Sequence, residues 1–404
     1  MSRRRAWYRW TDQVTSAFPH LSKPQATVLA LWSFGMVLAR SCALTSVAPF
    51  RARLLGQKRN TVQQRLREFY QEASAKTGNR RRALDVTTCF APLLRWLLRS
   101  WTGRQLPRAL DATTLGTRFV VLAISVVYRG TAIPIAWKLV PARAKPSWQE
   151  PWLELLRSFQ GVVPSDYQVV MLADRGLWAK WLFEGIQALG WHPFLRINLG
   201  GSFRPSGWAK FRSLKGFAPQ LGMRWSGRGT AFATKTARLD CTLLAYWGEG
   251  HAEPWLILTD LPPAYGEARW YGLRAWIAQG FKDSKRGGWQ WQHTRMTDPA
   301  RAERLWLALA VATLWLVRVG GEAEAPAAAV ELPELRLFGE TTTARPQAPR
   351  WRRVSVFRRG WIEIVVALLA QRPVPLGRLE PESWPELPEV PTPAPASALR
   401  EHAA

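Results

Sequence analysis

The chain has 404 residues, 47% of them hydrophobic, which is enough to bury a substantial core and favours two or three domains over one. Lysine and arginine total 56 against 29 aspartate and glutamate residues, so the formal net charge is +27. A folded chain this basic usually meets a polyanion, and nucleic acid is the leading candidate. A ribosome-associated protein, a membrane-surface protein and the arginine-rich composition of a GC-rich genome are the alternatives.

The cysteines and the apolar segments exclude several further classes. Cys42, Cys89 and Cys241 are odd in number and far apart, so neither a disulfide framework nor a paired-cysteine zinc site is expected, and a reducing, intracellular compartment fits. Met1 to Trp10 is rich in arginine, but no apolar segment follows it, so no secretory signal is predicted. The longest apolar stretch, Leu305 to Val317, is too short to span a bilayer and is typical of a buried helix.

Residues 1–104 are predicted to form a helical DNA-binding domain. Apolar residues recur at helical spacing from Ala26 to Ala39 and again through Thr61 to Tyr70, where Asn60 and Thr61 are the expected N-cap. The polar side of the second stretch carries Gln63, Gln64, Arg65 and Arg67. The second helix of a helix-turn-helix that reads DNA would have this pattern, and a helical bundle with a solvated polar face explains it equally well.

Residues 105–197 alternate between strands and helices. The order expected along the chain is strands at 108–111, 119–128 and 131–140, a helix at 148–159, a strand at 168–174, a helix at 178–189 and a strand at 193–197. The second and third strands are joined across Arg129 and Gly130 and are predicted to form a hairpin. This is the order of an RNase H-like α/β core with a mixed sheet.

The remainder divides into three further regions. Residues 198–262 are predicted to be a β-rich insertion, and 263–320 the second part of the core, with helices at 265–285 and 298–319. Residues 321–404 are rich in Pro, Ala and Glu and are expected to be a linker and tail, with one possible helix at 350–369. The earlier run Arg80 to Arg82 is either a linker that contacts phosphates or a solvated charge cluster.

Two aspartates each follow an apolar strand, Asp111 and Asp174. The carboxyl ends of parallel strands are where sites collect. Two aspartates brought together repel each other unless a divalent cation lies between them, so the pair is a candidate site for Mg²⁺ or Mn²⁺. Taken singly, each is better explained as an Asx-turn or a helix cap, because Asp111 precedes Ala-Thr-Thr and Asp174 precedes Arg-Gly.

The segment from Tyr271 to Lys285 favours the metal interpretation. It resembles the signature of the DDE transposases of bacterial insertion sequences, in which Tyr, two residues, Arg, three residues, Glu, six residues and Lys follow one another. Tyr271, Arg274 and Lys285 match that signature, but the position of the glutamate holds Ala278. The surroundings that also look like the family are Ile277, Gly280, Phe281, Lys282, Asp283 and the run from Arg286 to Trp289. With the motifs around Asp111 and Asp174, the resemblance spans about residues 105 to 320.

The resemblance implies a nuclease whose two metal ions are held by Asp111, Asp174 and a glutamate at position 278. Tyr271, Arg274 and Lys285 would contact phosphates of the transposon end, and an uninterrupted helix would place them with position 278 in one stripe. The further DNA contacts expected are Lys282, Trp289, Gln64, Arg65 and Arg67.

The alanine at position 278 predicts that strand cleavage is crippled, because no other carboxylate is well placed to replace the glutamate. On one continuous helix Asp283 would point roughly 140° away, and Glu267 would lie about 16.5 Å back along the axis. Gln279 is neutral and a poor Mg²⁺ ligand. Both decay of an element copy and deliberate substitution leave such an alanine.

The tryptophans allow two interpretations. Trp208, Trp225, Trp289 and Trp291 could stack on unpaired bases, although burial in the core is the commoner role of this residue. The expected partners are duplex DNA at transposon ends and at the target, and a second copy of the chain on paired ends, in the bacterial cytoplasm beside the nucleoid and without a membrane. A non-catalytic DNA-binding protein, such as a repressor derived from a transposase, and an RNA-binding protein are the competing functions.

Overall fold

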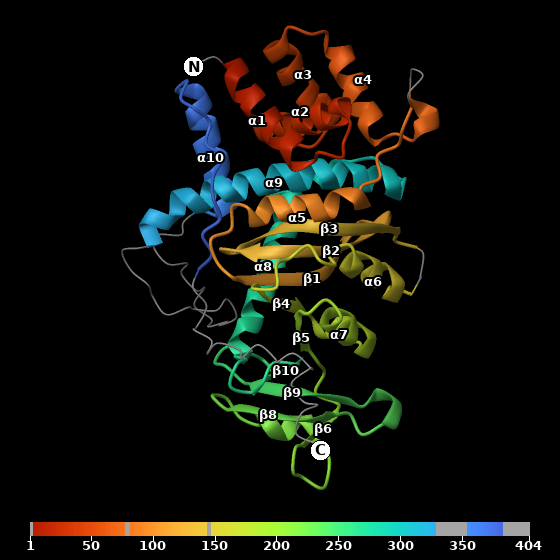
Figure 1. The fold of residues 1–404 in the computed structure, drawn as a ribbon, viewed down its shortest axis with the longest axis vertical. Coiled ribbons are helices and arrows are strands. Elements are labelled where there is room, and N and C mark those ends of the chain that lie inside the picture. The colour runs from red at the N-terminus through yellow and green to blue at the C-terminus, as the bar shows by residue number, and fades with distance from the viewer. Residues whose placement is uncertain (1–2, 77–80, 144–146, 329–353, 383–404) are drawn as a thin grey trace, which may run out of the picture.

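The computed structural model describes residues 3–76, 81–143, 147–328 and 354–382 (Figure 1). Its α-helices are α1 (Arg3–Ala17), α2 (Lys23–Ala39), α3 (Leu44–Leu55), α4 (Arg59–Tyr70), α5 (Phe90–Leu98), α6 (Gln149–Arg157), α7 (Lys180–Gln187), α8 (Trp276–Ser284), α9 (Pro299–Ala328) and α10 (Val356–Leu369). Arg80 and most of the segment expected to be linker and tail lie outside the described residues, whereas the helix expected at 350–369 is present as α10.

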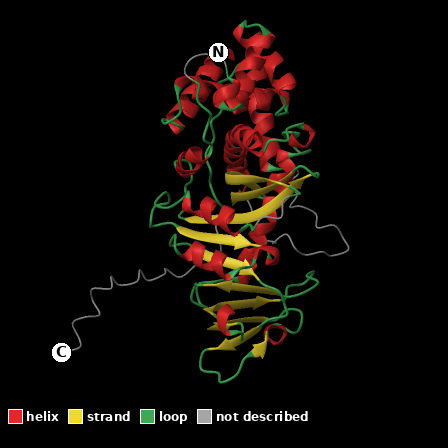
Figure 2. Ribbon diagram, turned by 90° about the vertical axis from the view of Figure 1, so that its right-hand side faces the viewer, coloured by secondary structure: helices red, strands yellow, loops and turns green. Residues whose placement is uncertain are grey.

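The architecture is mixed α/β, with a ten-stranded, mostly antiparallel sheet. The strands are β1 (Gln105–Leu115), β2 (Phe119–Tyr128), β3 (Thr131–Pro141), β4 (Gln168–Ala173), β5 (His192–Arg196), β6 (Ser202–Pro205), β7 (Arg212–Ser213), β8 (Arg224–Ala231), β9 (Leu239–Tyr246) and β10 (Trp255–Thr259). Their order across the sheet is β3-β2-β1-β4-β5-β10-β9-β8-β6-β7. Only β1, β4 and β5 run parallel to one another. The strands of the predicted insertion therefore extend the sheet beyond β5 (Figure 2).

The hairpin of β2 and β3 confirms the prediction made from the Arg129-Gly130 pair. Its register runs from Phe119 opposite Pro141 to Tyr128 opposite Thr131. Arg129 has φ 43° and Gly130 has φ 81°, so both central residues of the turn are left-handed. Turns of that kind match the twist of the flanking strands, which is why a short turn containing glycine fixes the pairing.

A long central helix, α9, lies between the N-terminal helices and the sheet (Figure 1). It packs on α2, α4 and β3, and Trp315 from it stacks on Trp10 of α1 with ring centres 4.0 Å apart. The part from Pro299 to Glu324 has the length and hydropathy of a membrane span, but 94% of the apolar window is buried inside the molecule. Burial between two layers accounts for its apolar composition, as expected for the segment around Leu305 to Val317.

Helix α10 crosses α9 where two glycines meet. A Cβ atom on Gly360 would lie 1.8 Å from the carbonyl oxygen of Leu316, and one on Gly320 would lie 1.9 Å from that of Val356. No side chain fits at either position, so the backbones of the two helices approach directly. This contact packs α10, which follows the predicted core in the chain, directly against α9.

The N-terminal helical region differs from its prediction in one detail. Helix α4 begins at Arg59, and its N-cap is Lys58 rather than Asn60 or Thr61. The cap makes no side-chain hydrogen bond. Helix α3 ends at Leu55, and its C-cap Gly56 has φ 66°, so the tight left-handed turn between α3 and α4 sets where α4 starts.

Candidate active site and nucleic-acid interface

Asp111 and Asp174 lie side by side at the point where two parallel strands stop pairing. The register of β1 and β4 ends with Leu110 opposite Ala173, so the two aspartates are the next residues on neighbouring strands. Strand β4 ends there, but β1 continues to Leu115, paired with β2. The prediction that the first strand ends at Asp111 was therefore wrong. The shared edge of the parallel strands is what brings the two carboxylates together.

Asp111 faces away from the layer formed by α6 and α7. Side chains alternate between the two faces of a strand, and Arg108 has the opposite parity. The guanidinium carbon of Arg108 lies 4.2 Å from the ring centre of Trp191 and 5.2 Å from that of Phe159, which follow α7 and α6. Asp111 therefore opens toward the opposite layer, where the segment from Ala268 to Ser284 packs.

Arg274 lies between the two aspartates. Its Nη2 is 2.9 Å from Oδ2 of Asp111 and 3.4 Å from Oδ2 of Asp174. All three side chains are largely buried, with Asp174 the most exposed at 36%. Burial raises the pKa of Asp111 above its ordinary value, although Arg274 beside it acts in the opposite direction. The position is thus one where two carboxylates share a single positive group.

Tyr271 contacts Asp174, and it does so from a 3₁₀ helix. The predicted helix at 265–285 is divided into η6 (Ala268–Ala275), a 3₁₀ helix, and α8, so the expectation of one continuous stripe was wrong. In a 3₁₀ helix residues three apart lie on one side, as Tyr271 and Arg274 do. The hydroxyl of Tyr271 donates to Oδ1 of Asp174 at 3.3 Å. Burial and the charge of Asp174 raise the pKa of Tyr271.

Lys285 contacts β1 at a point beyond Asp111. Its Nζ donates to Oγ1 of Thr113 at 2.8 Å and to the carbonyl oxygen of Thr114 at 2.9 Å. Burial lowers the pKa of Lys285 from its ordinary value. Tyr271, Arg274 and Lys285, the three matches to the signature, therefore all contact the two strand segments that carry the aspartates.

Ala278 is exposed on α8, and the carboxylates suspected of replacing its glutamate are engaged elsewhere. Asp283 is 2% exposed and accepts from Oγ1 of Thr131 and Nε2 of Gln279, both at 2.8 Å. Glu267 accepts from the backbone of Arg269 at the start of η6. In the part of the chain that the structure describes, no group of three or more His, Cys, Asp or Glu residues is arranged to hold a metal ion.

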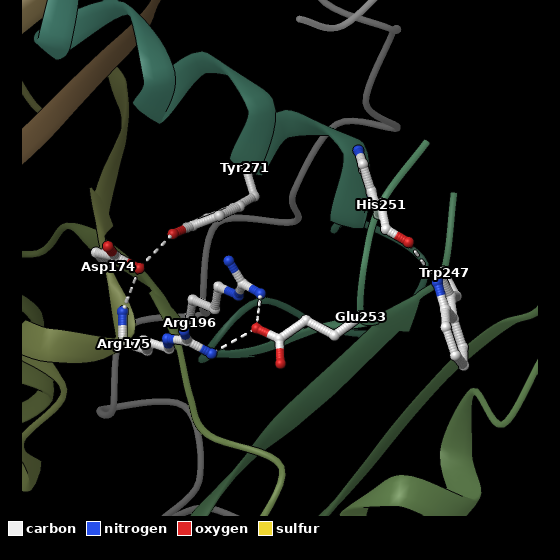
Figure 3. Close-up of polar contacts among 7 residues, drawn as sticks. All are labelled: Asp174, Arg175, Arg196, Trp247, His251, Glu253 and Tyr271. Atoms are coloured by element: carbon white, nitrogen blue, oxygen red, sulfur yellow. Dashed lines mark hydrogen bonds and ion pairs between the residues drawn. The ribbon is translucent and has the colours of Figure 1, made fainter. Parts of the chain in front are cut away.

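Three residues beside Asp174 were not singled out from the sequence. They are Arg175, Arg196 and Glu253, and Figure 3 shows both arginines paired with the carboxylate of Glu253, with Arg175 next to Asp174. Arg196 ends β5, the third parallel strand, and a residue at that edge could have been suspected. Glu253 stands in the turn between β9 and β10, and nothing in the sequence near it signals a place at the site.

No protein-family model matches the chain, and no curated protein matches it. One solved structure with a similar arrangement is the cryo-EM structure of a piggyBac transposase synaptic complex with hairpin DNA. The match covers 78% of this chain and 74% of that chain, with 10% sequence identity and a TM-score of 0.31. Because the similarity is this slight, we derive the function of this chain from its own residues.

The tryptophans expected at a DNA surface lie mostly in the core. Trp289 is 1% exposed and donates to Oγ1 of Thr313, and Trp291 is fully buried, so neither presents a ring to a ligand. Trp225 packs on Phe217 with ring centres 4.5 Å apart. Trp208, 50% exposed, is the member of this group whose ring remains open to solvent.

The residues expected to read DNA on α4 are exposed but distant from the aspartates. Gln64 and Arg65 have their nearest polar contacts with Glu68 and Gln57, at 3.0 and 3.4 Å, and Arg67 is also exposed. Helix α9 lies between these helices and the sheet (Figure 1). Lys282 is exposed on α8. The residues predicted to contact nucleic acid thus lie on two separate parts of the described fold.

Proposed function

We propose that this chain is a transposase of the DDE type that binds transposon-end DNA as a dimer and has lost strand cleavage through Ala278. One observation carries the proposal: Asp111 and Asp174, from adjacent parallel strands, converge on a single cationic group. Two carboxylates held together in a half-buried place repel each other unless a positive charge lies between them. Nη2 of Arg274 supplies that charge here, and carboxylate oxygens are also the ligands that Mg²⁺ and Mn²⁺ prefer.

The order of the strands supports an RNase H-like core. Strands β3-β2-β1-β4-β5 form the first half of the sheet, with the antiparallel hairpin on one side and the parallel strands on the other. The β-rich insertion separates β5 from η6, which returns the chain to the aspartates. Such an arrangement leaves one edge of parallel strands open to a ligand.

In the proposed reaction Asp111 and Asp174 would hold Mg²⁺ or Mn²⁺, which would supply charge stabilisation to the reacting phosphodiester oxygens. The hydroxyl of Tyr271 orients Asp174 through its hydrogen bond. Arg274 and Lys285 carry the positive charge that suits the phosphates of a bound strand. Because both now bond to the protein, DNA has to exchange these contacts for its own.

A non-catalytic DNA-binding protein is the second candidate, and Ala278 specifically favours it. The described residues provide no third carboxylate for the pair, and Asp283 is directed into the core. Loss of a well-placed charge-stabilising group typically slows a reaction by a hundred- to a thousandfold. Such a protein would keep its affinity for DNA ends, and a carboxylate restored at position 278 would not return strand cleavage.

The test is to restore the carboxylate. Ala278 is exposed, so Ala278→Glu introduces no clash, and we expect it to produce Mg²⁺-dependent nicking of duplex end DNA. The matched control is Ala278→Gln, because glutamine has the size of glutamate without its charge. This variant should stay inactive. Asp111→Asn or Asp174→Asn in the restored chain should abolish nicking. Brisk cleavage by the parent chain, or an Ala278→Glu chain that binds ends and never cuts, would contradict the proposal.

A further inference from the structure

A carboxylate occupies the space between two arginines next to Asp174. Oε1 of Glu253 lies 2.7 Å from Nη2 of Arg196 and also accepts from Nη1 of Arg175 (Figure 3). Arg175 follows Asp174 directly in the chain, and its backbone nitrogen donates to Oδ1 of that aspartate at 2.7 Å. One oxygen atom thus meets two guanidinium groups at the edge of the proposed catalytic pair.

The two arginines have positive charge and hydrogen-bond donors that Glu253 does not satisfy. One carboxylate charge faces two guanidinium charges, so Arg175, Arg196 and Glu253 together carry one positive charge, next to the one negative charge left by Asp111, Asp174 and Arg274. The side chain of Arg196 is only 16% exposed, and its buried Nε has no hydrogen-bond partner among the described residues. A buried donor without a partner is destabilising, so a ligand that accepts a hydrogen bond from it would bind more favourably.

The turn that carries Glu253 is held in place by other contacts. Nε1 of Trp247 donates to the carbonyl oxygen of His251 at 2.9 Å, and the ring of His251 stacks on Trp255 with centres 4.2 Å apart. The carboxylate is 31% exposed. It can therefore rotate into solvent without unfolding the turn.

We propose that Arg175 and Arg196 form a binding site for a DNA phosphodiester beside Asp174, and that Glu253 occupies this site in the DNA-free chain. The guanidinium fork matches the oxygens of a phosphate better than it matches one carboxylate oxygen. A phosphate between the arginines has two free oxygens and can also reach Nε of Arg196. This inference rests on the proposed function, because the strand it binds is the one that reaches Asp174.

Removing the competing charge should strengthen DNA binding. Glu253→Gln keeps the size of the side chain and removes its charge, and we expect the dissociation constant for duplex DNA to fall roughly tenfold. Arg196→Ala should raise it by a similar factor. In the double variant the benefit of Glu253→Gln should be lost, because the two residues act on one site.

The measurement is fluorescence anisotropy of a short labelled duplex titrated with the full chain at low salt. Matched controls come from Glu150 and Arg157 on α6, an exposed pair with side chains 61% and 57% accessible. Glu150→Gln and Arg157→Ala change the net charge by the same amounts as the two test variants. The site is supported if Glu253→Gln strengthens DNA binding, Glu150→Gln does not, and the gain in affinity is lost when Glu253→Gln is combined with Arg196→Ala.

Equal effects of Glu253→Gln and Glu150→Gln on a parent chain that binds DNA would overturn this inference and leave the proposed function standing. If the parent chain binds no DNA, the proposed function fails, and calorimetric titration with inorganic phosphate decides the site alone. Phosphate binding by the Glu253→Gln chain that disappears with Arg196→Ala would support the anion site. Failure of the Glu253→Gln chain to bind phosphate would overturn it.

Discussion

At the scale of single residues, the candidate site supplies its own counter-charges. Arg274 lies between Asp111 and Asp174, and Glu253 lies between Arg175 and Arg196. Any ligand therefore replaces an existing ion pair, and the measured affinity is a difference between two sets of contacts. A phosphate that draws Arg274 away would expose both carboxylates to a cation, so DNA and metal binding are expected to favour each other.

Asp283 gives a prediction about pH at the same scale. Burial raises its pKa to about 6, above the ordinary value of 3.8. Its neutral form is therefore favoured in the fold, and the stability that it contributes is present below the ordinary value and lost as pH rises through about 6. Asp283→Asn should thus stabilise the chain by about 2 kcal/mol at pH above 7 and by much less near pH 4.

The check is urea unfolding of parent and variant at both pH values. The control is Asp166→Asn, because the side chain of Asp166 is 54% exposed and pairs with Arg104 at the surface. Thr131 can accept from the new amide while Gln279 still donates, so the variant keeps both hydrogen bonds. A loss of stability that is the same at both pH values would show that the hydrogen bonds, and not the ionisation, decide the effect.

At the scale of elements, the local signals predicted the β2–β3 hairpin and did not predict where β1 ends or how the site is assembled. The hairpin across Arg129 and Gly130 was predicted correctly because the geometry of a short turn is determined by residues that are adjacent in the sequence. The division of the predicted helix at 265–285 was not, because periodicity alone does not reveal that Tyr271 and Arg274 turn inward to Asp174. Contacts between distant segments, such as Glu253 with Arg196, arise only from the folded sheet.

Helix α4 carries the prediction at this scale. Replacing Gln64, Arg65 and Arg67 with alanine should raise the dissociation constant for end DNA roughly tenfold or more, because each could contact a groove or a phosphate. The side chains are exposed, so each change should alter the free energy of unfolding by at most about 0.5 kcal/mol. Circular dichroism and thermal unfolding verify the fold, and anisotropy measures binding.

The matched control for α4 lies on α1, where Arg5, Arg9 and Gln13 give the same change in composition and charge. If this second triple weakens binding as much as the first, general charge rather than α4 is responsible. If neither triple matters, α4 is only a member of the helical bundle and the interface lies elsewhere.

At the scale of the whole molecule, the two surfaces predicted to contact nucleic acid lie at separate levels of one elongated fold. The N-terminal helices stand on one side of α9, and the sheet with Asp111 and Asp174 stands on the other (Figure 1). The insertion extends the sheet further from the helical end (Figure 2). A duplex that reached both surfaces would run along the molecule, which makes many phosphate contacts available at once.

Many phosphate contacts predict a steep dependence of binding on salt. The net charge of +27 is the excess of 56 basic over 29 acidic residues, and each phosphate that the basic residues neutralise releases a counterion. With on the order of six to ten contacts, affinity for duplex DNA should fall by about a thousandfold or more between low and physiological salt. The measurement is the slope of log Kd against log salt for end duplex, random duplex and duplex RNA. A flat slope would contradict binding through many phosphate contacts. Affinity for duplex RNA equal to that for end duplex at every salt concentration would favour an RNA-binding protein over the proposed transposase.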